Sequence, residues 1–349
     1  MNAKPWILYG ATGYTGRLTA ELAVQRGERP ILAGRTRAAL ETMGRELRLE
    51  TRAFDLHDPR GVRDGIRGAA AVLHDAGPFS TTSRPMVDAC IAERVHYLDI
   101  TGELDVFEAI FARDAEAKLA GVTLLPGVGF DVVPTDCLAA MLHERMPTAT
   151  HLELAFAGLG AMSRGTAKTS VERLGIGGAA RIEGKLQVVP HGWRKREIEF
   201  PHGRRTVVSI PWGDVVTAYR TTGIPNIVTY MAASRTLQRQ LVWLERFRPL
   251  LRVGLVQRAL KRAIDRRPAG PSETQRETGY TDLFGEARDA RGRVETLLLT
   301  TPDGYTLTAD SSLRAVRRLC DGGVPTGALT PALAFGARFI LDCEGVTLA

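Results

Sequence analysis

Apolar and polar residues alternate in blocks over the first third of the chain. Short apolar runs bounded by turn residues are typical of buried parallel strands, and stretches with helical spacing of apolar residues lie between them. The expected strands are Trp6–Tyr9, Pro30–Ala33, Thr51–Phe54, Ala70–His74, Val95–Leu98 and Val122–Leu125. Strands that alternate with helices imply right-handed crossover connections. This part of the chain therefore predicts an α/β fold with a doubly wound parallel sheet, a Rossmann domain.

The pattern changes after "PGVGFD" at residues 126–131. Segments such as "HLELAFAG", "RTVVSI", "VETLLLTT" and "YTLTAD" alternate with period two, which predicts a second, mostly antiparallel sheet with one covered face. Helical spacing is expected over Thr135–Met146, Leu237–Arg267, Ser311–Leu319 and Thr330–Leu341. We therefore expect a Rossmann domain over 1–130, an α+β domain over 131–325, and a C-terminal helix within 326–349 that packs back on the first domain.

Residues 7–18, "ILYGATGYTGRL", place three glycines between the first expected strand and a helix. Gly10 permits a tight turn, Gly13 lets the backbone approach a pyrophosphate, and Gly16 lets the helix pack close to the strand. The helix N-terminus then offers N–H groups to phosphates. A glycine-rich turn that holds no ligand is the alternative, but the position after the opening strand favours a dinucleotide. Cofactor contacts are expected from Gly10, Thr12, Gly13, Tyr14, Thr15 and Gly16.

Arg35 and Arg37 follow the second expected strand, where NAD-binding folds usually carry an acidic residue for the ribose 2′-hydroxyl. No Asp or Glu occurs from Pro30 through Leu40. A guanidinium group matches a 2′-phosphate, so this composition predicts NADP(H), although two solvated surface arginines would look the same. Further cofactor contacts are expected after the third and fourth strands, at Asp55, Gly77 and Pro78.

Several longer stretches resemble one protein family. "GATGYTGR", "YLDITGE", "PGVGFDVVPTD", "SRGTAKTS" and "TPALAFG" are similar to the saccharopine dehydrogenase-like oxidoreductases, and within them to the trans-acting enoyl reductases. The matching stretches run from residue 10 to residue 336. The resemblance implies a Rossmann domain, a second α+β domain for the substrate, a nicotinamide cofactor that is usually NADP(H), and reduction of C=C or C=N bonds.

Two acidic residues are candidates for direct chemistry. No tyrosine is followed four residues later by a lysine, which excludes short-chain dehydrogenase chemistry, and no HxH or HxxxH pair indicates a metal site. Asp131 and Glu103 follow expected strands, and a carboxyl group in an apolar cleft can stay protonated and act as an acid. Glu103 would equally suit the first turn of a helix. A mechanism that uses backbone donors and ordered water stays open.

Candidate substrate contacts lie further along the chain. The hydroxyl-rich stretch "SRGTAKTS" contains them together with a lysine, and an aromatic residue in "IPWGDVVTAY" would line an apolar pocket. Helix capping and core packing are the alternatives. The candidates are Thr101, Ser163, Thr166, Lys168 and Trp212.

Basic residues are concentrated in one segment. Residues 235–267 carry a net charge of +8 and the whole chain +7, so the remainder is nearly neutral. Nucleic-acid binding is not expected, because basic residues do not spread over a whole face with aromatics between them. This basic segment would bind an anionic membrane surface or an acyl-carrier protein, or would form a solvated helix face.

The sequence as a whole predicts an NADPH-dependent oxidoreductase that reduces a double bond in an apolar or acyl, lipid-like substrate. One alternative is an imine or amino-acid dehydrogenase of the saccharopine type. The other is a non-catalytic nucleotide-binding protein at a membrane or partner surface. Scattered cysteines and the absence of a signal-like N-terminus predict a cytoplasmic protein, peripheral to a membrane if the basic segment binds one, and a homodimer is compatible with all three.

Overall fold

The chain divides into two units in the computed structural model, which describes residues 4–158, 160, 162–251, 253–266 and 268–349. The first unit comprises Met1–Val133 and Tyr305–Gly336, and the second comprises Pro134–Gly304 and Ala337–Ala349. The chain thus returns to the first unit at Tyr305, earlier than the expected residue 326. The final residues belong to the second unit.

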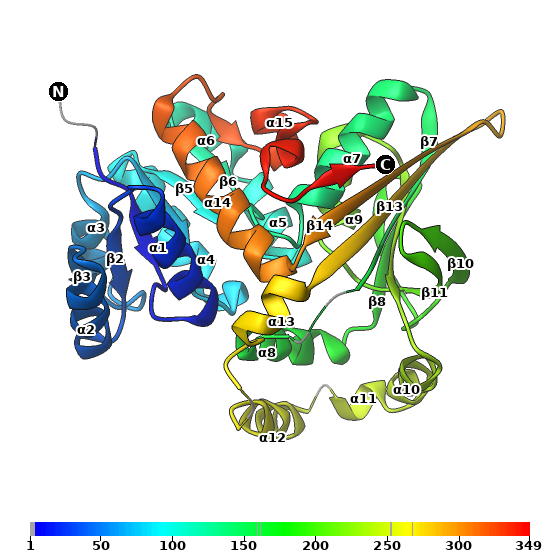
Figure 1. The fold of residues 1–349 in the computed structure, drawn as a ribbon, viewed down its shortest axis with the longest axis horizontal. Helices are drawn as coiled ribbons and strands as arrows, with labels where there is room; N and C mark the ends of the chain where they lie inside the picture. The colour runs from blue at the N-terminus through cyan, green and yellow to red at the C-terminus, as the bar shows by residue number, and fades with distance from the viewer. Residues whose placement is uncertain (1–3, 159, 161, 252, 267) are drawn as a thin grey trace. The chain divides into compact units, whose positions relative to one another are not determined.

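The first unit is built on a parallel sheet with the strand order β15-β6-β5-β4-β1-β2-β3 (Figure 1). The strands are β1 (Ile7–Tyr9), β2 (Ile31–Gly34), β3 (Thr51–Ala53), β4 (Ala71–His74), β5 (His96–Asp99), β6 (Thr123–Leu125) and β15 (Gly327–Ala328). The expected strands are all present: most are apolar runs that are buried on both faces, whereas β3 is a half-buried edge strand with the sequence Thr-Arg-Ala. The order of the strands reverses between β4 and β1, and dinucleotides bind at the carboxyl ends of strands at such a point.

Helices connect and cover these strands. They are α1 (Tyr14–Gln25), α2 (Arg37–Leu47), α3 (Pro59–Ile66), α4 (Phe79–Glu93), α5 (Leu104–Phe111), α6 (Asp114–Ala120), α14 (Gly304–Asp321) and α15 (Pro331–Phe335). The two-residue strand β15 was not expected. It pairs in parallel with Thr123 and Leu124 of β6, and a strand of that length leaves no periodic signal in a sequence.

Two sequence-based expectations in the C-terminal part were wrong. "YTLTAD" at residues 305–310 belongs to helix α14 rather than to a strand, because Leu313, Val316 and Leu319 continue at three-residue spacing and outweigh a short alternation. The expected helix Thr330–Leu341 is instead α15 followed by a 3-10 helix at Phe339–Asp342. Gly336, with a φ of 91°, ends α15.

The second unit contains a mixed sheet with the order β10-β11-β12-β7-β13-β14-β16, and β8 pairs with β12 and β9. Its strands are β7 (Ala149–Ala157), β8 (Gly178–Ile182), β9 (Lys185–Val189), β10 (Lys195–Phe200), β11 (Gly203–Ser209), β12 (Asn226–Ala232), β13 (Tyr280–Asp289), β14 (Val294–Pro302) and β16 (Thr347–Leu348). The pairing is antiparallel except between β12 and β7. One face buries an apolar cluster that includes Ala155, Tyr230 and Phe284.

The helices of the second unit are α7 (Val133–Arg145), α8 (Arg164–Leu174), α9 (Asp214–Thr222), α10 (Arg235–Arg246), α11 (Arg248–Leu251), α12 (Gly254–Ile264) and α13 (Glu273–Thr278). The basic segment therefore forms three helices. The break falls near Pro249, which has no N–H to continue the helical hydrogen bonds. Among the described helices, none combines the length and the hydropathy that crossing a bilayer requires.

Candidate functional site

The glycine loop between β1 and α1 is too crowded for side chains at two of its three glycines. A Cβ atom on Gly16 would lie 2.4 Å from the carbonyl oxygen of Gly10, and one on Gly10 would lie 2.8 Å from the backbone nitrogen of Ala76. Gly10 also has a φ of 90°, which favours glycine. The N–H of Gly13 donates to the Gly10 carbonyl at 2.9 Å. The loop is thus a tight turn that holds the start of α1 against β1.

The N-terminus of α1 has no side-chain cap. Gly13 occupies the N-cap position and forms no side-chain hydrogen bond, since glycine has none to offer. Thr12 and Gly13 are exposed, and Tyr14 and Thr15 are half-buried. Uncapped amides at a helix N-terminus, next to a loop that lets a ligand approach the backbone, fit a phosphate group.

Arg35 directly follows β2 and Arg37 is the first residue of α2, and both are exposed. Within the described residues, neither side chain forms a hydrogen bond or an ion pair. Asp55 follows β3, and its carboxylate accepts hydrogen bonds from the backbone N–H of His57 at 3.0 Å and from the His57 ring at 2.7 Å. The His57 backbone amide, followed by its ring, lowers the pKa of Asp55. The guanidinium groups are therefore available to a 2′-phosphate, while Asp55 is a charged, partnered carboxylate.

Two ionisable residues at the end of β4 were not expected as site residues. His74 is fully buried, its Nε2 has no partner among the described residues, and burial lowers its pKa to about 3. Asp75 follows it, and burial raises the pKa of Asp75 to about 7. The available signal was a histidine that ends a buried apolar strand and an aspartate that directly follows it. Gly77 and Pro78, which come next, are joined by a cis peptide bond.

Asp99, at the end of β5, ties two loops together. Its carboxylate accepts hydrogen bonds from the Tyr97 hydroxyl at 2.7 Å and from the backbone N–H groups of Thr101 and Gly127 at 2.9 Å each. The Thr101 hydroxyl in turn accepts from the N–H of Glu103 at 3.1 Å. Thr101 is fully buried, so its side chain shapes the loop that follows β5.

Glu103 is buried, and both oxygens of its carboxylate are engaged. They accept hydrogen bonds from the backbone N–H groups of Phe79 at 2.7 Å and Ser80 at 2.8 Å, at the start of α4. The carboxylate thus caps a helix N-terminus, where a negative charge is stabilised. The capping role is the one that this geometry supports.

Asp131 follows β6 in the loop 126–132 and lies close to the loop after β5. A Cβ atom on Gly102 would come within 2.6 Å of its Oδ2 atom. Its carboxyl group forms no hydrogen bond or ion pair with any described residue, and burial raises its pKa to about 7. Helix α14 fixes this loop, because the Thr308 hydroxyl accepts from the N–H of Phe130 at 3.0 Å and the Ser311 hydroxyl donates to the Val128 carbonyl at 2.8 Å.

Residues 6–125 match the family model of the saccharopine dehydrogenase NADP binding domain. That match covers about a third of this chain. A trans-acting enoyl reductase of Mycobacterium leprae is 32% identical over 153 residues, which cover 40% of this chain and 35% of that protein. The trans-acting enoyl reductase of Mycobacterium tuberculosis strain H37Rv is 32% identical over 154 residues, with the same coverage. The match thus spans about a third of the length of these relatives.

The structure of saccharopine dehydrogenase (L-Glu forming) from Saccharomyces cerevisiae covers 99% of this chain and 99% of its own, with a TM-score of 0.69 and 12% identity. At that identity the match concerns the fold alone. Together the comparisons confirm the resemblance to saccharopine dehydrogenase-like proteins, the α/β fold and the choice of NADP(H), and they support the prediction of an NADP-dependent oxidoreductase.

The other candidate substrate residues lie in the second unit, outside the residues 6–125 that match the family model. The Ser163 hydroxyl caps α8 by accepting from the N–H of Thr166 at 3.3 Å. Lys168 forms an ion pair with Asp265 at 2.5 Å. The Trp212 ring packs 4.8 Å from that of Phe156. Each side chain therefore has a structural role within its own unit, and their contact with a substrate stays a prediction.

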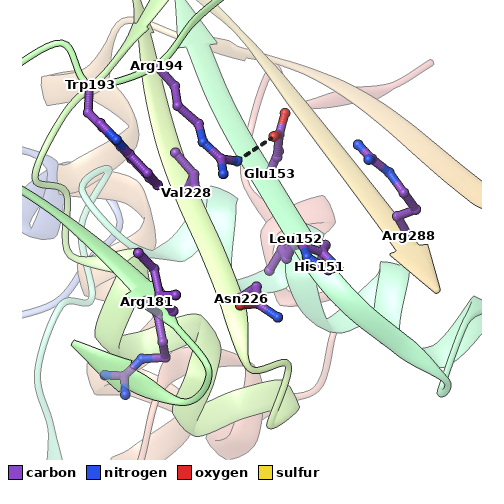
Figure 2. Close-up of a pocket in the computed structure, with 10 residues that line it drawn as sticks. His151, Leu152, Glu153, Arg181, Trp193, Arg194, Asn226, Val228 and Arg288 are labelled. Carbon is purple, nitrogen blue, oxygen red and sulfur yellow. Dashed lines mark ion pairs between the residues drawn. The ribbon is translucent and has the colours of Figure 1, made fainter. Parts of the chain in front are cut away.

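Figure 2 shows a pocket of about 220 Å³ on the sheet of the second unit. Its polar wall includes Glu153, which lies 3.8 Å from Arg194 and also pairs with Arg196. Arg181 is buried and donates to the carbonyl groups of Val215 at 2.6 Å and Gly184 at 2.8 Å. Because Glu153 and Arg181 are already bound to other protein groups, we do not include this pocket in the catalytic site. Across the described residues, no group of three His, Cys, Asp or Glu side chains is arranged to hold a metal ion.

Proposed function

We propose that this chain is an NADPH-dependent oxidoreductase that reduces a carbon–carbon double bond conjugated to a carbonyl group, in an apolar or acyl substrate. The NADP-binding domain and the relatives named trans-acting enoyl reductases support this proposal. The observation that carries it is the carboxyl group of Asp131. It follows a strand of the sheet that carries the glycine loop, and its raised pKa lets it hold a proton near neutral pH.

The residues of the glycine loop fit a dinucleotide, because Cβ atoms on Gly10 and Gly16 would collide with the backbone that shapes the cradle. Bound NADPH supplies a hydride. The uncapped amides of α1 would bind the pyrophosphate, with Thr12, Tyr14 and Thr15 beside it. Arg35 and Arg37 would bind the 2′-phosphate over β2, and Asp55 would lie toward the adenosine.

Asp131 would donate the proton that the reduction requires. When a conjugated C=C bond accepts a hydride at the β-carbon, negative charge develops on the α-carbon and the carbonyl oxygen. A neutral carboxyl group can transfer its proton to the α-carbon and leave as the carboxylate. A general acid works best when its pKa lies near the operating pH, as the pKa of Asp131 does. Glu103 would position the start of α4 rather than donate a proton.

The charge of the surrounding loops favours an uncharged reacting group. The loops that follow β4, β5 and β6, residues 74–80, 99–104 and 126–132, contain no Lys or Arg. They contain the four acidic residues Asp75, Asp99, Glu103 and Asp131. Because these loops offer no basic side chain to pair with a carboxylate, they do not favour a substrate with several carboxylates, whereas a thioester or another neutral acyl group needs no such partner. The saccharopine-type imine reaction therefore ranks second.

Two measurements test the proposal. Calorimetric titration with NADPH and NADH checks cofactor binding, and a non-catalytic protein would bind NADPH but turn over none of the substrates. Loss of reduced-cofactor absorbance is then compared between enoyl thioesters and mixtures of 2-oxo acids with amino acids. We expect turnover of enoyl thioesters that Asp131→Asn lowers and the matched surface variant Asp321→Asn does not. Turnover of the oxo-acid mixtures alone would overturn the proposal in favour of the imine reaction.

A further inference from the structure

Helices α10, α11 and α12 follow one another along one edge of the second unit (Figure 1). The inward sides of the two longer helices pack on that unit. Leu260 and Ile264 of α12 form an apolar cluster with Ala167 and Val171 of α8. On α10, Leu241 and Leu244 are half-buried. These residues form the core-facing apolar stripe that is expected of an amphipathic helix, so the packing of α10 and α12 on the unit does not need further apolar side chains.

Polar contacts hold the middle of this segment in place. Glu245 accepts a hydrogen bond from the backbone N–H of His191 at 3.0 Å and pairs with Arg248 at 3.0 Å. Ser234 caps α10 by accepting from the N–H of Leu237 at 3.2 Å. Contacts at both ends of α10 thus fix its orientation, and a defined set of its side chains faces outward.

That outward face carries apolar side chains that the fold does not cover. Five large apolar residues are between 46% and 70% exposed, namely Trp243, Phe247, Leu250, Val253 and Leu255. The rings of Trp243 and Phe247 stack with centroids 5.7 Å apart and planes 5° apart. Because these two residues are one helical turn apart, they lie on the same side of α10, and the half-buried Leu241, two residues before Trp243, lies on the other side.

Unpaired arginines surround these apolar residues. On α10, Arg235 and Arg239 precede Trp243 at four-residue steps and so share its face. Arg258 and Arg262 lie on the same side of α12 as Leu255, and Arg266 follows shortly after the end of that helix. These five, together with Arg246, are exposed, and within the described residues none of their side chains forms a hydrogen bond or an ion pair. The face therefore combines aromatic and aliphatic side chains with uncompensated positive charge.

We propose that this outward face of α10, α11 and α12 binds the surface of a bilayer that contains anionic lipids. The arginines would contact lipid phosphates, and Trp243, Phe247 and Leu255 would enter the region between headgroups and acyl chains. Amphipathic helices with basic and aromatic residues bind bilayers in this way, with affinity from both charge and buried apolar area. An acidic protein would neutralise the arginines, but it would need a separate apolar recess for each of five side chains spread over three helices.

Sedimentation with phospholipid vesicles tests the proposal on the full chain. We expect the protein to bind vesicles of phosphatidylcholine with phosphatidylglycerol, and to bind much less to pure phosphatidylcholine or at high salt. Trp243 is the exposed tryptophan, so binding should shift the tryptophan emission to shorter wavelength, and Trp243→Phe should abolish most of that shift. Equal binding to both vesicle types would overturn the proposal.

Variants separate charge from apolar insertion. Arg239→Gln with Arg246→Gln should weaken binding about 25-fold, since each arginine near an anionic surface contributes about fivefold. Trp243→Ser with Phe247→Ser should weaken vesicle binding about tenfold.

The matched pairs Arg60→Gln with Arg291→Gln, and Leu119→Ser with Val294→Ser, alter exposed residues elsewhere and should have no effect on vesicle binding. The proposal fails if the matched pairs weaken binding as strongly, or if only an acidic carrier protein binds and the aromatic pair is dispensable. NADPH affinity should be unchanged in every variant, which keeps this test independent of the proposed reaction.

Discussion

The carboxylate of Glu103 accepts a hydrogen bond from the backbone N–H of Phe79 at 2.7 Å, across two loops at the same edge of the sheet. Phe79 is the first residue of α4, and the amide of Ser80 is bound in the same way. A residue that follows β5 therefore holds the helix that follows β4, and the loop of Gly77 and Pro78 lies directly before it.

Glu103→Ala should leave these amides without acceptors and lower the free energy of unfolding by about 2 kcal/mol. Glu103→Gln should cost less, because an amide oxygen can still accept one of the two bonds. Urea denaturation of the three proteins measures the difference. If Glu103→Gln abolished turnover while unfolding stayed unchanged, Glu103 would take part in the chemistry instead of capping α4.

Arg35 should determine the preference for NADPH over NADH. Arg35→Ala removes an exposed guanidinium group that pairs with no described residue. Affinity for NADPH should fall about 30-fold, because that is the contribution of charge-assisted hydrogen bonds to a phosphate group. Affinity for NADH should change little. Arg45→Ala alters an exposed arginine on α2, the helix that follows Arg35, and is the matched control in calorimetric titration. Equal losses for both cofactors would show that Arg35 does not hold the 2′-phosphate.

Gly16 should tolerate no side chain. In Gly16→Ala the new Cβ atom would lie 2.4 Å from the Gly10 carbonyl oxygen, so α1 or the loop must move. We expect the free energy of unfolding to fall by about 1–3 kcal/mol and the affinity for both NADPH and NADH to fall together. Gly254→Ala, where a Cβ atom meets nothing within 4 Å, should be neutral in thermal unfolding and titration. Normal cofactor binding by Gly16→Ala would show that the tight turn at Gly10–Gly16 does not determine cofactor binding.

Asp131 should make stability depend on pH. Burial raises its pKa to about 7, above the value of an exposed aspartate, so folding favours the protonated form. The protonated carboxyl group of Asp131 therefore makes its full contribution to the free energy of unfolding below about pH 4, and this contribution is lost as pH rises through about 7. Asp131→Asn removes the ionisation, so the variant should gain about 1–3 kcal/mol relative to the parent protein between those pH values. Denaturation at both ends of the range checks the sign, and an advantage that shrinks with rising pH would refute it.

Asp131 should also set the pH profile of turnover. If its carboxyl group donates the proton, kcat should fall above about pH 7 with a single ionisation. Asp131→Asn should lower kcat by about 10²–10⁴-fold and flatten the profile. Asp321→Asn should leave both unchanged. A profile that keeps its shape in Asp131→Asn would assign the proton to water or to another group.

Strands and turns that depend on neighbouring residues alone could be predicted from the sequence. Most of the strands from β1 to β6 were predicted because they are apolar runs, with a weaker pattern at β3, and the glycine loop was predicted because its spacing follows from backbone contacts within one turn. The same kind of local evidence gave the wrong element at residues 305–310, where a short alternation lies inside the longer helix α14. Strand β15 exists only because the chain returns to Thr123 and Leu124 after a long excursion.

The sequence by itself determined the Rossmann architecture, the position of the nucleotide loop and the basic segment, because spacing and composition express these directly. Tertiary structure alone distinguished Glu103 from Asp131. Both are acidic residues in loops that follow buried strands, and the protonation of a carboxyl group depends on the donors and solvent that surround it. Two amides of α4 hold Glu103, while α14 fixes the loop of Asp131 and leaves its half-buried carboxyl group without a hydrogen-bond partner among the described residues. Those surroundings come from distant parts of the chain, so only the fold could assign them.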